Sequence, residues 1–350
     1  MLTVVDSLTE SVSVADFPHL DEVDRQIVAA LQVNGRASWR KIAAALGASE
    51  STVTRRGQQL LSDRAVAVTG VLDHLRCGLG ISIHVRLRVR PGCALKVARA
   101  LAAHSRPRFV AVVTGSFDVS AEIVVASHRE VMRVLDELDG IDDVVETESI
   151  VVTRKFSAFE EWNPCSLDGR AVDLLRAGAE VTDYAHRDWT ETEQLTDQDV
   201  AIARVLATNG RRSYAGIATA VGTSESTVAR RVESMVQRGC LRFRTVFEAP
   251  TVGYDVEYLL WLEVAPGLVE EVGERLAKHP ATRYVAATTG RHNLILQGVL
   301  SGYGDLYPYT TEVIGQLPGV QSADLTLQVQ ALKRAWVPIG DDGRPQPREM

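Results

Sequence analysis

Apolar residues recur every three or four positions near the start of the chain, as they do along one face of an amphipathic helix. The first such stripe stops at Gly35, a helix stop signal. Ser38 can cap a second, short helix that ends at Gly47, and Ser49 can cap a third. The stripes consist of Val23, Ile27 and Leu31, of Ile42 and Leu46, and of Val53 and Leu60. This pattern predicts three helices with a tight glycine turn before the last.

The period of the pattern changes from about 3.6 to two after residue 80. Residues 81–90 alternate between apolar and polar, which is typical of a half-buried strand. Gly115 marks a tight turn between two later strands. The predicted segments are a strand at 81–90, a helix at 95–104, strands at 109–114 and 117–126, a helix at 130–138 and a strand at 144–153. This βαββαβ order is that of a ferredoxin-like module.

The same sequence pattern returns 175 positions later. Residues 42–56 read IAAALGASESTVTRR and residues 217–231 read IATAVGTSESTVARR, with 11 of 15 positions identical. Thr114-Gly115 likewise matches Thr289-Gly290. The second α/β module is predicted as strand 257–264, helix 268–279, strands 283–289 and 294–300, helix 304–316 and strand 320–330. Because one copy is as large as a domain or two, the repeat indicates a tandem protein rather than a solenoid.

We therefore expect an α+β chain with two three-helix, winged or helix-turn-helix domains and two ferredoxin-like modules in tandem. A helix around Val172–Leu175 is expected inside the connecting segment, and both tails are expected to be disordered. The expected order is a tail at 1–20, a helix-turn-helix domain at 21–66, a βαββαβ module at 78–155, a linker at 156–194, a second helix-turn-helix domain at 195–241, a second module at 253–336 and a tail at 337–350.

Composition narrows the class of protein. No apolar run approaches the ~20 residues of a membrane span, and the acidic start lacks the basic region of a signal peptide. The four cysteines are scattered, and the histidines show no metal-binding spacing. These features predict a cytoplasmic protein without a metal or other cofactor.

The net charge of −7 argues against nucleic-acid binding, but its distribution argues for it. Residues 36–64 hold six basic and two acidic side chains, and residues 204–244 hold eight arginines and two acidic side chains. A solvated helix surface is the alternative explanation of such runs. The candidate DNA-binding residues, at the start and along the exposed face of each third helix, are Ser49, Glu50, Ser51, Thr54, Arg55 and Arg56 in the first copy and Ser224, Glu225, Ser226, Arg230 and Arg231 in the second.

A helix-turn-helix followed by a βαββαβ module with a TG-x-x-D turn resembles the leucine-responsive/asparagine regulator (Lrp/AsnC) family. The resemblance covers about 21–155 and 195–336. It implies a transcriptional regulator that is not an enzyme, binds double-stranded DNA, is controlled by a small effector such as an amino acid, and forms a homo-oligomer through RAM-type modules. The effector-binding residues that it implies are Thr114, Gly115, Ser116 and Asp118, and Thr289, Gly290, Arg291 and Asn293.

The two copies depart from that family pattern at different places. Gly57 lies inside the first recognition helix, where the second copy has Val232, and Arg64 replaces the glycine found at Gly239. Both changes predict a poorer first DNA-binding domain. In the second effector turn, Asn293 replaces the carboxylate of Asp118, so that turn is expected to tolerate an anionic ligand better than an ammonium group.

Three alternatives remain at this point. The helices can serve packing alone, and the TG turns can simply need glycine at positive φ, with Asp118 and Asn293 bonding to the turn backbone. Siroheme decarboxylases share the architecture and also occur as tandem fusions, although His84, His104, His128 and His292 form no catalytic pattern in the sequence. A ligand sensor with degenerate DNA binding is the third. We favour a regulator whose two modules pair about a pseudo-two-fold axis.

Overall fold

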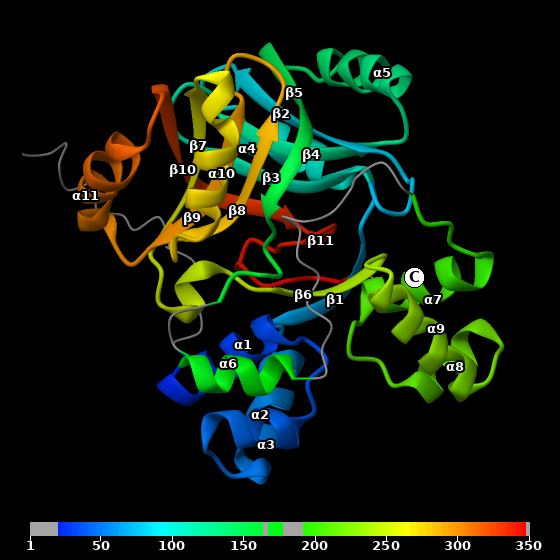
Figure 1. The fold of residues 1–350 in the computed structure, drawn as a ribbon. Helices are drawn as coiled ribbons and strands as arrows, with labels where there is room; N and C mark the ends of the chain where they lie inside the picture. Colours follow the sequence, from blue (N-terminus) through cyan, green and yellow to red (C-terminus); the bar gives the residue numbers. More distant parts are fainter. Residues whose placement is uncertain (1–19, 164–166, 178–191, 348–350) are drawn as a thin grey trace, which may run out of the picture.

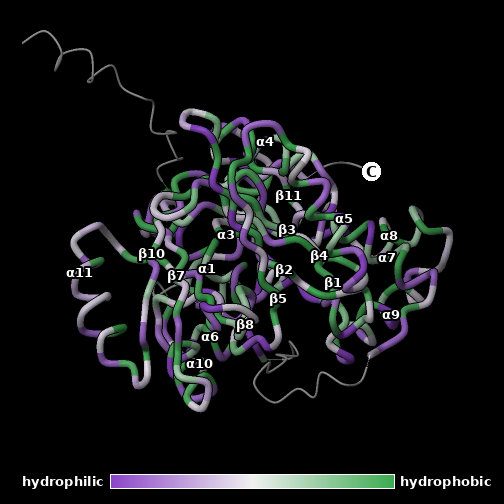
Figure 2. Tube along the Cα trace, turned by 90° about the horizontal axis from the view of Figure 1, so that it is seen from above, coloured by the Kyte–Doolittle hydropathy of each residue, from purple (hydrophilic) through white to green (hydrophobic). Residues whose placement is uncertain are grey.

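The computed structural model describes residues 20–163, 167–177 and 192–347. Two α/β modules form one shell, and the first helix-turn-helix domain lies beneath it (Figure 1). The second helix-turn-helix domain projects to one side, at the opposite end of the molecule from α11 (Figures 1 and 2). Within the described ranges, no helix is long and apolar enough to span a membrane.

Each copy begins with the three predicted helices. Serine, threonine or aspartate caps every one of them, with a side-chain oxygen that accepts a hydrogen bond from the backbone of the first turn. The helices are α1 (Glu22–Val33), α2 (Trp39–Leu46) and α3 (Glu50–Ser62), and α7 (Asp197–Thr208), α8 (Tyr214–Val221) and α9 (Glu225–Gln237).

A strand that the hydropathy pattern did not reveal follows each set of helices. These strands are β1 (Ala67–Leu72) and β6 (Leu241–Val246), and they pair antiparallel with each other, Ala67 opposite Val246. Each is only six residues long, and β1 contains Gly70, whose absent side chain makes room for Leu206 of α7. The two helix-turn-helix domains are thus joined to each other through one shared ribbon.

The α/β modules follow the predicted order. The first contains β2 (Ile81–Val89), α4 (Ala94–Ala103), β3 (Pro107–Val113), β4 (Val119–Val125), α5 (His128–Asp139) and β5 (Val144–Ser157). The second contains β7 (Val256–Val264), α10 (Val269–Ala277), β8 (Thr282–Thr288), β9 (Leu294–Leu300) and β10 (Val320–Arg334). The helix predicted at 304–316 is not a continuous α-helix. It consists of short turns at Tyr303–Asp305, Leu306–Pro308 (α11), Tyr309–Val313 and Ile314–Gln316, the third of them π-helical.

The two sheets close on each other through their last strands. The beginning of β10 pairs with β7 of its own module, and its end pairs with β3 of the other module. In the same way β5 pairs first with β2 and then with β8. The strand order β10-β3-β4-β2-β5-β8-β9-β7 therefore returns to β10. This closure leaves few unpaired edges and places a shared apolar core between the sheets, built around Trp261, Tyr284 and Phe159.

The segment that connects the two copies and the C-terminal segment both contain regular structure. The helix expected around Val172–Leu175 is confirmed as α6 (Gly169–Arg176), and Leu175 is fully buried against the first helix-turn-helix domain. The expectation of a disordered tail from residue 337 is wrong as far as residue 347. Val337–Pro338 (β11) pairs with β10, and Val337 and Ile339 are buried there, which the glycines and prolines of the tail had obscured. The expected tail at 1–20 lies outside the described residues except for Leu20, which is buried against the first helix-turn-helix domain.

Candidate nucleic-acid interface and effector turns

The two recognition helices, α3 and α9, are built alike. A left-handed glycine, Gly47 or Gly222, turns the chain between the second and third helices. Ser49 then caps α3 through the Thr52 amide at 3.2 Å, and Ser224 caps α9 through the Thr227 amide at the same distance. The exposed predicted residues are Ser49, Glu50, Ser51 and Arg55, and Ser224, Glu225, Ser226 and Arg230, while Thr54, Arg56 and Arg231 are half-buried.

The two arginines of each RR pair have different surroundings. Arg56 forms ion pairs with Asp21 and, at 3.1 Å, with Asp24 at the start of α1. Arg231 pairs with Asp199 of α7 at 3.0 Å. By contrast, Arg55 and Arg230 are exposed, and no ion pair joins either to another described residue. The second arginine of each pair therefore fastens the recognition helix to the first helix of its domain, and the first arginine points to solvent.

Reciprocal arginines join the two helix-turn-helix domains. Arg36 donates to the Gly210 carbonyl at 2.6 Å, and its counterpart Arg211 donates to the Gly35 carbonyl at 2.6 Å. The Arg211 guanidinium also lies 4.3 Å from the centre of the Trp39 ring. Burial lowers the pKa of Arg211 to about 10. These arginines contribute to the basic runs in the sequence but face the other domain, so the charge count overstates the basic surface open to DNA.

The two sequence changes in the first recognition helix have different structural effects. A Cβ on Gly57 would lie 2.3 Å from the Trp39 ring, so this glycine makes room for a large side chain. Arg64 adopts φ of +56°, the left-handed conformation that Gly239 adopts in the second copy at +69°. The helix end is therefore conserved in shape, and a non-glycine residue there carries about 1 kcal/mol of strain. Trp39 was not among the predicted site residues. It corresponds to Tyr214 in the second copy.

The TG turns each hold the long strand of the opposite module. Thr114 donates its amide to the Leu327 carbonyl at 2.9 Å, and the Leu327 amide donates to the Thr114 hydroxyl at 3.1 Å. Thr289 makes the same two bonds with Val151, at 2.9 and 3.0 Å. Gly115 and Gly290 have φ of +97° and +91°. The predicted threonines and glycines thus lie together at the surface on each side of the pseudo-two-fold axis.

The acidic and amide residues of these turns bond to backbone. Asp118 Oδ2 accepts from the Val89 amide at 2.8 Å, and Asn293 Oδ1 accepts from the Val264 amide at 2.9 Å. Asn293 also donates to the Val264 carbonyl at 2.7 Å, a bond that a carboxylate cannot make. Ser116 and Arg291 are exposed, and Arg291 pairs with Glu263 at 3.0 Å. One Asp118 oxygen is thus used by the fold, as is the whole amide of Asn293.

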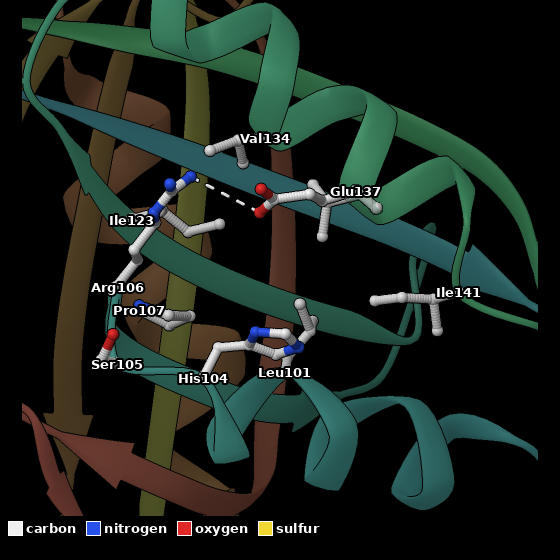
Figure 3. Close-up of a pocket in the computed structure, with 10 residues that line it drawn as sticks. Leu101, His104, Ser105, Arg106, Pro107, Ile123, Val134, Glu137 and Ile141 are labelled. Carbon is white, nitrogen blue, oxygen red and sulfur yellow. Dashed lines mark hydrogen bonds and ion pairs between the residues drawn. The ribbon is translucent and has the colours of Figure 1, made fainter.

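A cleft that sequence reasoning missed lies on the outer face of the first module, between α4 and α5 (Figure 3). It has a volume of about 240 Å³, an apolar floor that includes Ile123 and Val134, and the Arg106–Glu137 ion pair at 3.4 Å. The equivalent place in the second module is filled by Tyr258 and Tyr309, with ring centres 5.1 Å apart. No sequence motif marks this cleft, because its existence depends on which side chains pack between the helices.

Comparison with known proteins agrees with this architecture. The AsnC-type helix-turn-helix domain matches residues 20–61 and 195–236, and the Lrp/AsnC ligand binding domain matches residues 82–161 and 257–336. The chain is 29% identical over 146 residues to an uncharacterised HTH-type transcriptional regulator of Pyrococcus furiosus. The aligned region spans 41% of this chain and 99% of the relative. It is 28% identical over 136 residues to the HTH-type transcriptional regulator Ptr1 of Methanocaldococcus jannaschii, spanning 39% of this chain and 92% of the relative.

A solved structure of similar length shares the tandem fold. The siroheme decarboxylase NirDL superposes with a TM-score of 0.58 and 17% identity, covering 90% of this chain and 93% of that one, a likeness of fold alone. The four histidines named above do not gather at one site: His84 is buried between the sheets, His104 lines the outer cleft, His128 begins α5 and His292 lies beside Arg86. The two domain families together match well over half of the chain, which therefore belongs to the Lrp/AsnC family of transcriptional regulators and carries its DNA-binding and ligand-binding domains twice in one polypeptide.

Proposed function

We propose that this regulator binds one operator with two unlike recognition helices. The observation that carries the proposal is the covalent pairing of α3 and α9, held by the β1–β6 ribbon and by the reciprocal Arg36 and Arg211 bonds. The two recognition faces differ, with Thr54 and Gln58 in one and Ala229 and Glu233 in the other. Two different faces at a fixed separation favour an imperfect palindrome.

Selection from a random DNA library tests the operator proposal. We expect two related half-sites of different sequence at one fixed spacing. A perfect palindrome would contradict the claim that the two faces read differently, and no enriched sequence would contradict specific DNA binding.

The exposed arginines give a finer test. Arg55→Ala and Arg230→Ala should each lower the slope of log affinity against log salt by about 0.9, the value for one lost phosphate contact. Arg56→Lys and Arg231→Lys are the matched controls, since each keeps the positive charge beside Asp24 or Asp199. Salt-dependent binding to the selected operator is the measurement, and an unchanged slope in both alanine variants would exclude Arg55 and Arg230 as phosphate contacts.

The TG turns are the proposed effector sites of a cytoplasmic, homo-oligomeric regulator. Asp118 can pair with the ammonium of an amino acid through the oxygen that Val89 does not use. At Asn293 the amide is neutral and bonds to the Val264 backbone, so it offers no charge to an ammonium group. Arg291, although paired with Glu263, adds a positive charge nearby, so we expect this turn to favour an anionic ligand.

The Asp118→Asn variant tests this assignment without disturbing the turn, because Asn293 makes the same backbone bond in the second copy. Calorimetric titration with a panel of amino acids and organic acids should show weaker amino-acid binding in the variant. Unchanged affinity would return Asp118 to a purely structural role.

A further inference from the structure

An apolar cavity of about 540 Å³ lies beneath the second helix-turn-helix domain. It is bordered by α7, by β1 and by the end of β10 with the segment that follows it, and it opens to solvent on one side. Its described lining is mostly aliphatic, and Trp336 contributes an aromatic side chain. This size and composition are those of small-molecule sites, which span roughly 300–1,000 Å³ and are lined mainly by apolar side chains.

The equivalent space beneath the first helix-turn-helix domain is filled by the protein itself. There Trp162, Tyr254 and Phe247 pack against α1, together with Leu175 from α6. The residues 175 positions away from the three aromatic side chains are Val337, Leu79 and Leu72, and all three line the cavity. Three aromatic side chains in one copy are therefore aliphatic in the other, and these smaller side chains account for the open space.

The polar groups in the cavity lining favour one kind of ligand. Arg204 and Lys333 are positively charged, and the described lining contains no aspartate or glutamate. The buried Lys333 ammonium donates to the His104 carbonyl, so Arg204 is the cation proposed to meet a ligand. His74 is 3% exposed, and its Nε2 has no hydrogen-bond partner among the described residues. Burial lowers the pKa of His74 to about 3, so its ring is neutral at physiological pH and adds no charge to the lining.

We propose that this cavity binds a small apolar molecule that carries one anionic group, with the apolar part against Leu72, Leu79 and Val337 and the anion near Arg204. This site is separate from the TG turns. The occupied cavity would supply to α7 the packing that Trp162 and its neighbours supply to α1. The effect of the ligand on operator binding rests on the proposed function, but the existence of the site does not.

The experiment uses the full-length chain and 8-anilinonaphthalene-1-sulfonate, an aromatic monoanion that fluoresces when bound in apolar surroundings, with decanoate as competitor. We expect one displaceable probe per chain. Val337→Trp should abolish binding, because it copies Trp162, which fills the equivalent space in the first copy. The Trp162 indole donates to the Pro280 carbonyl at 2.9 Å. The residue equivalent to Pro280 is Ser105, which lines the cavity. Leu79→Tyr, which copies Tyr254, is the second filling variant should the first not fold.

Two further variants identify the site. Val134→Tyr copies Tyr309 and fills the outer cleft of Figure 3, so it should leave probe binding unchanged. Arg204→Ala should weaken binding about tenfold, as expected for one lost charge-assisted bond. No saturable binding by the wild-type chain, or binding that survives Val337→Trp and Leu79→Tyr in folded protein, would overturn the proposal. None of these measurements uses DNA. A negative result would therefore contradict the cavity site without bearing on whether the protein binds an operator.

Discussion

The two helix-turn-helix domains have nearly the same sequence pattern but pack differently against the remainder of the molecule. The first shares one continuous apolar core with Trp162, Phe247 and α6. The core of the second, around Ile202 and Met235, reaches only to Cys77 and to ribbon residues such as Leu241, and a cavity lies beside α7. Helices with the same hydrophobic pattern can therefore be fixed firmly or loosely, according to the segments that pack beneath them. Substitutions that copy a residue of one half into the other test this difference directly.

The largest expected effect is at the base of the first domain. Trp162→Val copies Val337 and should open a cavity under α1, lowering the free energy of unfolding by about 3 kcal/mol or more. Val337→Ala is the matched control and should cost less, since Val337 already borders an empty space. Urea denaturation followed by circular dichroism measures both. Equal losses of unfolding free energy would mean that the two domains pack equally well against the segments beneath them.

The next effect concerns the interior of the shell. His84 is fully buried, and neither ring nitrogen has a hydrogen-bond partner among the described residues, while its counterpart in the second module is Leu259. Burial, reinforced by Arg108 and Lys155 and opposed by Glu122, lowers the pKa of His84 to about 4. As the pH falls from 6.5 to 4, the unfolded chain binds a proton at this histidine before the folded chain does, so the folded state loses stability.

His84→Leu should remove that loss. Its stability relative to wild type should rise by about 3 kcal/mol between pH 7 and pH 4, at 1.36 kcal/mol per pKa unit. Unfolding free energies measured in urea at several pH values provide the test. Parallel pH profiles for the two proteins would show that His84 does not stay neutral in the folded state.

A third substitution tests the packing of the first recognition helix. Gly57→Val copies Val232 but would push a side chain into the Trp39 ring, so it should lower stability by about 1–3 kcal/mol despite removing a glycine from a helix. Adding Trp39→Tyr, which copies Tyr214, should recover most of the loss. Thermal melts of the single and double variants measure this coupling, and a stabilised single variant would refute the steric argument.

The smallest expected effect is at the end of the same helix. Arg64→Gly copies Gly239 and relieves a left-handed arginine at φ of +56°. The gain should be at most about 1 kcal/mol, because the glycine also adds freedom to the unfolded chain. Arg64→Ala keeps the strained conformation and serves as the control. A shift in melting temperature for alanine as large as that for glycine would assign the effect to lost charge.

Much of the fold could be predicted because its signals are local. Helical and alternating periodicities located the helices of both domains and the strands of both modules, and the 175-residue offset indicated the tandem arrangement. Strands β1 and β6 were missed because each is short and is stabilised by a partner from the other copy. The helix expected at 304–316 has the right composition, but its backbone includes a π-helical turn at Tyr309–Val313.

The candidate sites show the same division between local and tertiary information. The sequence located the recognition helices and the TG turns, but it could not separate Arg55 from Arg56, since only the position of α1 brings Asp24 to the second arginine. From the sequence, basic residues such as Arg36 and Arg211 were counted as surface charge. The structure places both of them in the contact between the two helix-turn-helix domains.

By itself, the sequence determined the family, the duplication and the order of the elements, because these follow from motifs and periodicities that a short window contains. The tertiary structure decided which glycines and arginines serve packing, where β5 and β10 cross between modules, and that one DNA-binding domain rests on a filled core while the other adjoins a cavity. These features depend on residues that are distant in sequence, from Gly57 against Trp39 to Trp162 against Pro280, and on whether their volumes together fill the space between the elements.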